Sequence, residues 1–338
     1  MKKLFFYVVV LAISGITIQA QTVRFVDNNQ GAPTASGVNY TDIQAAVDAS
    51  SPGDIIYIQP SPNNYGNITM TKRLNIYGIA HNPELNAGQR PYVPNIYFNG
   101  AAAMSKISGL YVSNIYLSYN FNNNGVVISN NEIIGEIQGP GNTTTNNDII
   151  IVGNYFNNAG GSHSIDNNSG QNWTIANNLF YKNHTQPTYQ LLYRLNNTTL
   201  LNNNIILTRQ NGDSNQSIEI FLNCNATQIS NNIFIFTGNN VANMNLGGNT
   251  SLLFNNNLTY NVTSPFDALA GSNNIDDTNP QFVSFDPSLV LKNPSNDFHI
   301  QGGSPAQNAG SDGNDLGVFN GAYPFSIRGY PTELPYFQ

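Results

Sequence analysis

The stretch Ile175-Ala176-Asn177-Asn178-Leu179-Phe180 decides how this chain folds, because close copies of it return along the sequence. Each copy has an aliphatic residue, a spacer, two Asn or Asn-like positions and two apolar residues. Asn recurs at one place in the phrase, in steps of 23, 24, 26, 28 and 24 residues, at Asn131, Asn154, Asn178, Asn204, Asn232 and Asn256. A period in the twenties, with β-forming residues on both sides of the phrase, indicates a solenoid.

The repeats predict a solenoid made of strands. Each repeat contains two or three short β-forming runs separated by turn residues, and none contains a helix-length apolar pattern. A leucine-rich horseshoe would need regularly spaced Leu, and an antiparallel sandwich would not need a fixed phrase. A coil whose turns stack ~4.8 Å apart pairs its backbone in parallel ladders. We therefore expect an all-β, single-stranded parallel β-helix of roughly nine or ten turns, on the order of 45 Å long.

The Asn column is expected to be structural. Equivalent side chains of successive turns stand above one another, and an amide both donates and accepts hydrogen bonds, so stacked Asn side chains can bond to each other along the axis. Asn also tolerates the left-handed backbone of a tight corner. A buried amide without a partner costs about 1–3 kcal/mol, so the column stabilises the fold only if it is continuous.

The first twenty residues have the features of a secretory signal peptide. Lys2 and Lys3 precede an apolar run over 4–18, and Ala20 offers a small residue at a cleavage site. The run is too short to predict a membrane span, and no span is expected after its removal. We predict cleavage after Ala20 and a secreted or periplasmic protein.

Composition excludes some classes of function. Loss of the two lysines leaves 10 basic residues against 19 acidic ones, a net charge of about −9 for the mature chain. No basic stripe exists to neutralise phosphates, so nucleic acid is not an expected partner. Charged residues make up 9% of the chain and hydrophobic ones 40%, which is not the composition of a disordered protein. The single cysteine, Cys224, is expected to be a small buried apolar residue.

The N-terminal part of the mature chain has a different pattern. Residues 41–49 predict one amphipathic helix, in which Thr41 and Gln44 form a capping box, and Pro52 and Gly53 end it. We expect four parts: a signal peptide over 1–20, an N-terminal cap and first strand over 21–60, coils over 61–261, and the last coils with a C-terminal cap and tail over 262–338.

This arrangement resembles secreted right-handed parallel β-helix proteins of the pectate-lyase-like superfold. The stretch from Tyr40 to Ile58 resembles their capping helix and first strand, and the stretch from Ser304 to Gly317 resembles their closing turns. The resemblance covers nearly the whole mature chain and implies a right-handed coil. It implies little about chemistry, because this superfold contains lyases, hydrolases, adhesins and non-catalytic proteins.

Aligning the charges to the Asn column gives the candidate catalytic residues. Lys182 and Arg209 fall on neighbouring turns near one line, and Asp166, Arg194 and Glu219 fall in three consecutive turns. A polysaccharide lyase needs a base and a means of neutralising the uronate. Lys182, Arg209 and Arg194 are the candidates for these two needs. Asp166 and Glu219 would ligate Ca²⁺ if the protein is a lyase. The alternative is that all five are solvated surface charges.

No motif in the chain identifies an enzyme. The Gly-His-Gly and Arg-x-Lys signatures of the superfold's hydrolases and the Asp-His strand motif of its lyases are absent, and no metal site or cofactor is predicted. Aromatic residues are candidates for stacking on sugars or for packing, among them Tyr181, Tyr193 and Trp173. A strongly acidic chain repels uronate polymers unless Ca²⁺ intervenes, whereas a neutral glycan meets no such penalty.

Three hypotheses follow. The first is an exported, non-catalytic β-helix that binds a glycan or another surface component, with polysaccharide as its partner. The second is a carbohydrate-active enzyme of the lyase type. The third is a structural or adhesive rod.

Overall fold

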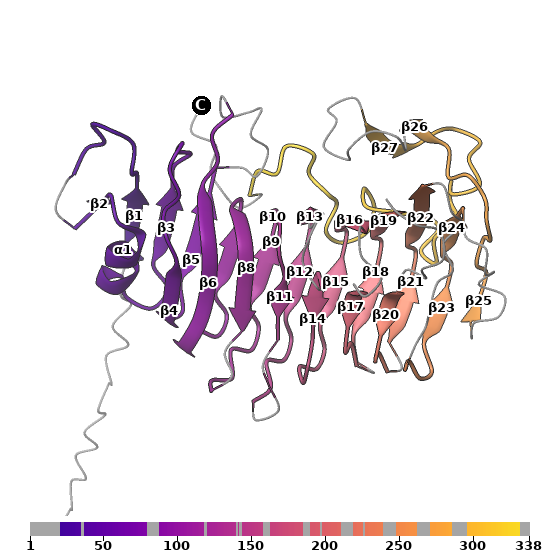
Figure 1. Ribbon diagram of the computed structural model, residues 1–338, viewed down its shortest axis with the longest axis horizontal. Coiled ribbons are helices and arrows are strands. Elements are labelled where there is room, and N and C mark those ends of the chain that lie inside the picture. The colour runs from indigo at the N-terminus through magenta and orange to yellow at the C-terminus, as the bar shows by residue number, and fades with distance from the viewer. Residues whose placement is uncertain are drawn as a thin grey trace, which may run out of the picture.

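The strands of this protein stack into one continuous solenoid (Figure 1). The computed structural model describes residues 21–34, 37–79, 88–117, 120–139, 141, 144–157, 163–184, 190–196, 198–210, 219–225, 227–238, 248–261, 271–285 and 296–331. The predicted signal peptide lies outside these residues. Within them the chain forms one α-helix and 27 strands.

One face of the solenoid is a twelve-stranded parallel sheet. From β1 onward each strand pairs with the strand one turn further on, and the short strand β2 adds to the outer edge of β1. In spatial order the strands are β2 (Asn39–Tyr40), β1 (Val23–Val26), β3 (Ile55–Ile58), β5 (Asn75–Gly78), β7 (Lys106–Ser108), β9 (Val127–Ser129), β12 (Ile150–Val152), β15 (Thr174–Ala176), β18 (Leu200–Asn202), β21 (Gln228–Ser230), β23 (Leu253–Asn255) and β25 (Gly271–Ser272).

The second sheet divides into two faces. Its first strands are β4 (Ile68–Lys72), β6 (Tyr92–Ala101) and β8 (Tyr111–Leu117), and β8 is long enough to pair with two later strands. The start of β8 leads into what we call the strapped face: β10 (Glu132–Ile133), β13 (Tyr155–Asn157), β16 (Leu179–His184), β19 (Ile205–Gln210), β22 (Ile233–Gly238) and β24 (Leu258–Tyr260). The end of β8 leads into what we call the lateral face, which continues β4, β6 and β8: β11 (Ile137–Gln138), β14 (Ile165–Asp166), β17 (Gln190–Tyr193) and β20 (Glu219–Leu222).

The interior follows from the two-residue alternation of strands. On every face alternate residues point inward, and the inward rows of Ile, Leu, Val and Phe are fully buried. Phe156 and Phe180 stack inside the coil on adjacent turns, with ring centroids 4.4 Å apart. The predicted fold class, a parallel β-helix with an N-terminal helix and an internal Asn column, is confirmed.

Helix α1 (Ile43–Ala49) covers the N-terminal end of the second sheet. The prediction that Thr41 caps this helix is wrong. The N-cap is Asp42, whose carboxylate accepts a hydrogen bond from the Ala45 N–H at 2.6 Å. The Gln44 side chain instead bonds to both backbone groups of Thr69 on β4, at 2.8 and 3.2 Å. This contact occupies the exposed edge of the sheet, which would otherwise invite pairing with another chain.

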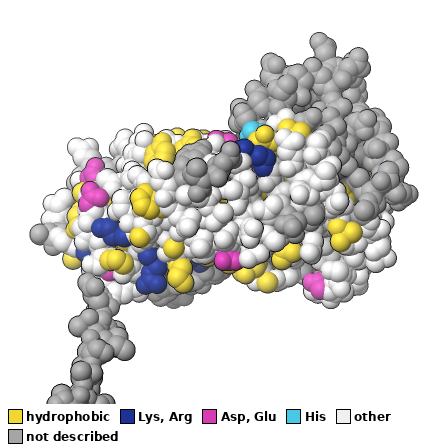
Figure 2. Space-filling view, turned by 90° about the horizontal axis from the view of Figure 1, so that it is seen from below, with side chains coloured by type: hydrophobic (Ala, Val, Ile, Leu, Met, Phe, Trp, Pro, Cys, Tyr) yellow, Lys and Arg dark blue, Asp and Glu magenta, His cyan; other side chains and the backbone are white. Residues whose placement is uncertain are grey.

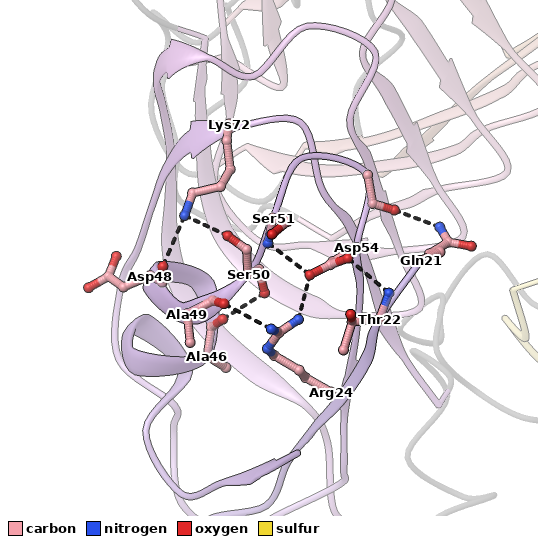
Figure 3. Close-up of polar contacts among 11 residues, drawn as sticks. Gln21, Thr22, Arg24, Ala46, Asp48, Ala49, Ser50, Ser51, Asp54 and Lys72 are labelled. Atoms are coloured by element: carbon pink, nitrogen blue, oxygen red, sulfur yellow. Dashed lines mark hydrogen bonds and ion pairs between the residues drawn. The ribbon is translucent and has the colours of Figure 1, made fainter. Parts of the chain in front are cut away.

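A buried ion pair joins this helix to the first strands (Figure 3). The Arg24 guanidinium donates to Asp54 at 2.5 Å and to the carbonyl of Ala49, the last helical residue, at 2.8 Å. Burial raises the pKa of Asp54, but hydrogen bonds from Ser51, Thr22 and Arg24 outweigh it and hold the pKa below its usual value. Because both charges have partners, they fix the helix against the sheet rather than destabilising it.

The inner Asn column is a continuous hydrogen-bonded ladder. At each step the backbone N–H and the side-chain amide of one Asn donate to the side-chain oxygen of the Asn one turn on; for Asn178 and Asn204 these distances are 2.9 and 3.1 Å. The same Asn178 amide donates to the Ile151 carbonyl of the preceding turn at 2.9 Å. The residues of the ladder are Asn131, Asn154, Asn178, Asn204, Asn232, Asn257 and Asn274.

Asn256 is not in this ladder, and its assignment there is wrong. Asn255 pairs with Ser230, so Asn256 takes the place of Asn231, one residue before the ladder position. Asn256 has φ +55° and Asn231 has φ +59°, both in the left-handed region. The phrase therefore contains two columns, a left-handed corner residue followed by an inward ladder residue.

The corner column holds the C-terminal segment, residues 304–331, which we call the strap. The amide of Asn177 donates to the carbonyls of Val318 and Asn320, and the amide of Asn256 donates to the carbonyl of Ala309 at 3.0 Å. The strap crosses the strapped face on its way back toward the N-terminal end (Figure 1). It follows an antiparallel hairpin of β26 (Phe282–Ser284) and β27 (Asp297–Ile300).

The strap explains why the outer surface of the strapped face is apolar. Ala306, Leu316 and Val318 of the strap are buried against two outward rows of that face. The rows, in register across the turns, are Tyr155, Leu179, Ile205, Ile233 and Leu258, and then Tyr181, Leu207, Ile235 and Tyr260. A second, smaller apolar cluster thus lies outside the coil.

None of the helices in the described parts of the chain is long and apolar enough to cross a membrane.

Candidate functional site

The lateral face carries a different kind of outward row. One residue from each of seven successive turns lies in register along the solenoid: Thr69, Tyr97, Tyr116, Gln138, Asp166, Tyr193 and Leu222. The residues on either side of these in each strand point into the core, for example Ile96 and Phe98 beside Tyr97. Strand alternation therefore directs the row outward. The row contains aromatic rings and hydrogen-bonding side chains, and the strap does not bury it as it buries the outward rows of the strapped face.

The N-terminal part of this row lines a pocket of about 420 Å³. The rings of Tyr97 and Tyr116 stack with centroids 5.0 Å apart and planes 10° apart, and Tyr97 is 36% exposed. Amides of Asn99, Asn120 and Gln138 also line the pocket, and no charged side chain does. Aromatic surface with amide donors and acceptors around it is suited to a neutral polyhydroxylated ligand.

Further along the row an ion pair replaces the aromatic stack. Arg194 donates to both carboxylate oxygens of Asp166, from Nε at 2.8 Å and from an η nitrogen at 2.5 Å. Asp166 is 3% exposed, whereas about a third of the Arg194 side chain is exposed. Arg194 itself has φ +57°, a conformation that is costly for a non-glycine residue. The fork-shaped contact fixes both groups in one orientation.

The ring of Tyr193 is held between two partners. His163 stacks on it with centroids 4.5 Å apart and planes 8° apart, and the Arg194 guanidinium carbon lies 4.5 Å from its centroid. The imidazole and the guanidinium therefore both pack against the ring of Tyr193. His163 Nδ1 also lies 3.9 Å from a carboxylate oxygen of Glu136. In Figure 2 one His side chain adjoins Lys or Arg side chains on a surface that is otherwise mostly uncharged.

Lys182 is not part of this surface, which corrects its assignment as a surface cation. It is 0% exposed and lies in register with Thr208 and Phe236, both buried. Burial lowers the pKa of Lys182 to about 8, while the nearby Glu136 carboxylate acts in the opposite direction. Lys182 is therefore a cation of the coil interior, and no substrate reaches it in this structure.

Two of the three aromatic candidates are also buried. Trp173 is 0% exposed and donates from Nε1 to the Asn146 carbonyl at 2.7 Å. Tyr181 is 2% exposed and lies under the strap. Both are packing residues, so their assignment to sugar stacking is wrong. Tyr193 is partly exposed, and its ring already packs against His163 and Arg194.

The structure brings together only part of the predicted charge cluster. Asp166 and Arg194 are in contact, and β14, β17 and β20 are neighbours as predicted from the spacing. Glu219 pairs through its backbone with Gln190, and Arg209 pairs with Asn183 rather than with Lys182. The side chains of Arg209 and Glu219 lie outside what the structure describes.

Neither metal nor thiol chemistry has a site among the described residues. They contain no group of three or more His, Cys, Asp or Glu side chains placed to hold a metal ion. Cys224 is buried, and burial raises the pKa of its thiol to about 12, so it is not a nucleophile at neutral pH.

Tyr97 and Tyr116 were not among the sequence candidates, although the sequence contains a signal for them. Both stand third in an Asn-Ile-Tyr-apolar pattern, 95–98 and 114–117, one turn apart. The Asn114 amide donates to the Asn95 side chain at 3.0 Å, so the first position of the pattern also repeats in space. Looking for a second repeated phrase beside the Asn phrase would have found this pair.

Comparisons with known proteins give no family for this chain. No protein-family profile and no curated protein sequence matches the chain. Among solved structures it is similar to two crystal structures of pectin methylesterase from Aspergillus niger, in penultimately deglycosylated and in deglycosylated form. The first has 13% identity and a TM-score of 0.38 over 75% of this chain and 81% of that one. The second has 11% identity and a TM-score of 0.36 over 77% and 84%. The fold assignment rests on the strand pairing of this chain.

Proposed function

We propose that this protein is an exported, non-catalytic glycan-binding β-helix that holds its ligand along the lateral face. The observation that carries the proposal is the uncharged pocket at Tyr97 and Tyr116, which opens onto a row of polar side chains in register. Sugars offer apolar C–H faces for the rings and hydroxyl groups for the amides.

The shape of the row favours an extended ligand over a compact one. Tyr97 and Tyr193 are four turns apart, a distance of roughly 19 Å at ~4.8 Å per turn. A linear oligosaccharide lying parallel to the solenoid axis would meet one outward side chain at each turn. Because those side chains are fixed by strand pairing, little entropy is lost in ordering them on binding.

The lyase alternative has less support from the residues described. Lys182 is inside the coil, and Arg194 is committed to Asp166. Neither group is therefore placed to remove a proton from a bound sugar. A rod-like structural role has no specific observation in its favour.

Binding and activity should be tested on the same preparation. We expect hits on a glycan array, with an affinity that isothermal titration calorimetry can measure, and about a tenfold loss of that affinity, ~1.4 kcal/mol, for Tyr97→Ala or Tyr116→Ala. Tyr323→Ala, which removes an exposed Tyr from the strap, is the matched control and should bind normally. Release of unsaturated products from uronate polymers would establish the lyase instead.

Export is tested separately. Expression of the full chain in a secreting host should give a mature protein that begins at Gln21, which N-terminal sequencing would show. Retention of residues 1–20 on the mature protein would contradict this part of the proposal.

A further inference from the structure

We infer that the glycan held by the lateral face is uncharged, and that the face selects against uronate chains. The inference rests on the proposed function and specifies its ligand. It is drawn from how the charges along the row are paired, not from the net charge of the chain.

The stacking end of the row offers nothing to an anion. The pocket at Tyr97 and Tyr116 is lined by aromatic and aliphatic groups, amides and hydroxyl-bearing side chains, and by no Lys, Arg or His. A carboxylate entering it would lose hydration and gain no opposite charge, which is unfavourable. A hydroxymethyl group in the same position would meet no such cost.

The cation on the row is already committed. Arg194 makes two hydrogen bonds to Asp166 and lies over the ring of Tyr193, on which His163 also stacks. A ligand carboxylate that took Arg194 would leave the 3% exposed carboxylate of Asp166 without its partner. Breaking a buried pair in this way is strongly unfavourable.

The remaining charges near the row also balance. Glu136 lies beside His163 on the surface, and its carboxylate interacts electrostatically with Lys182 inside the coil. Among the described side chains, Lys182 in the coil interior and Arg194 on the row give two positive charges, and Glu136 and Asp166 give two negative ones, so the surroundings of the row have no surplus of positive charge when His163 is neutral. The face would discriminate against uronates because the part of it that the structure describes has no unpaired cation for their carboxylates.

The experiment compares ligands that differ only in charge. Tetrasaccharides of galacturonate, glucuronate and mannuronate would be measured by calorimetry against the same compounds after reduction of each carboxylate to a hydroxymethyl group. In 20 mM salt we expect at least one reduced compound to bind, and its uronate parent to bind at least about tenfold more weakly.

Each outcome separates the two proposals. A uronate that binds as tightly as its reduced form would overturn the inference and leave glycan binding intact. Absence of binding by every compound of both kinds, together with an empty glycan array, would reject the proposed function itself.

One substitution tests the physical cause. Asp166→Asn releases Arg194, so the preference for the reduced compound over its parent should fall at least about fivefold. The matched control is Asp148→Asn, which makes the same charge change at an exposed left-handed position before β12, away from the lateral face, and should leave the ratio unchanged.

A second substitution keeps the test valid if Asp166→Asn proves unstable. Glu136→Gln removes one negative charge at a partly exposed position on the same surface. We expect it also to lower the preference for the reduced compound over its uronate parent. A ratio that stays constant in folded Asp166→Asn or in folded Glu136→Gln would contradict the assigned cause.

Discussion

The strapped face and the lateral face are built from the same coils, yet their outward residues differ. On the strapped face the outward rows are apolar, for example Ile205 and Ile233, and the strap buries them. On the lateral face the outward row contains Tyr97, Tyr116 and Gln138, which stay at least partly exposed in the described part of the chain. Strand alternation thus fixes which residues point outward, while their burial depends on a segment that can lie more than 140 residues away in sequence, as Asn320 does from Asn177 (143 residues).

The largest effect is expected from a change in the Asn ladder, because the ladder supports the coils that carry both faces. Asn178→Leu takes one amide out of the middle of the ladder: the Asn154 N–H loses its acceptor, the Asn154 amide keeps only the Ile128 carbonyl, and the Ile151 carbonyl loses the amide bond. We expect the free energy of unfolding to fall by about 3–5 kcal/mol. Urea denaturation measures this. Asn63→Leu, in an exposed turn, is the control, and equal stability of the two variants would contradict the ladder.

The second prediction tests the difference between the faces directly. Ile233→Ala, on the strapped face, removes a fully buried side chain and should cost about 3 kcal/mol. Tyr97→Ala, at an outward position of the lateral face, should cost about 1 kcal/mol, mostly from the lost ring stack. Thermal or urea unfolding of both variants gives the two values. Similar costs would show that the lateral row is structural rather than available to a ligand.

The third prediction concerns the interior between the faces. The pKa of Lys182 is lowered from 10.5 to about 8, so the folded state releases its proton more readily than the unfolded state. Below pH 8 the buried charge is destabilising, and we expect Lys182→Met to raise the free energy of unfolding at pH 7 by about 1–3 kcal/mol.

The stability difference between Lys182→Met and the wild-type protein should also change with pH. Between pH 8 and 10.5 the unfolded state binds more protons at this site, so wild-type stability rises relative to the variant and the advantage of Lys182→Met shrinks. Urea midpoints at pH 7 and pH 9.5 measure it. Lys106→Met, on a surface strand, should show no such trend, and a gap that does not change with pH would refute the buried charge.

The smallest effect is expected where the strap is attached. Asn177→Gly keeps the left-handed corner but loses the amide that donates to Val318 and Asn320. We expect a loss of about 1 kcal/mol and faster proteolytic cleavage within the strap, followed by mass spectrometry. Asn130→Gly, at the same corner position two turns earlier, should cleave at the wild-type rate. Equal rates for both variants would mean that the corner column does not hold the strap.

The sequence predicted the solenoid well because the ladder needs one residue type at one place in every turn. The error in the Asn column, Asn256, arose where three Asn stand together and the letters alone do not say which one takes the left-handed corner. The site was harder to predict. A shift of one residue moves a side chain from the surface to the core, and this is what separates Lys182 from a surface position.

The burial of Tyr181 has another cause. Its outward orientation follows from alternation, but the strap that covers it is held by contacts that no local pattern encodes. Contacts of this kind, between the corner column and a segment far away in the chain, are the part of the fold that a repeat analysis does not reach.

The ladder has a consequence for how such a protein changes length. Each turn begins and ends at the same corner, so a complete turn can be removed or added without changing the register of the others. Excision of residues 155–178 joins Asn154 to Leu179, recreates the phrase and lets Asn154 bond directly to Asn204. The lateral row would shorten by one step of ~4.8 Å and bring Gln138 beside Tyr193. The reach of the binding surface can thus be adjusted in integer units by duplication or deletion, with no redesign of the core.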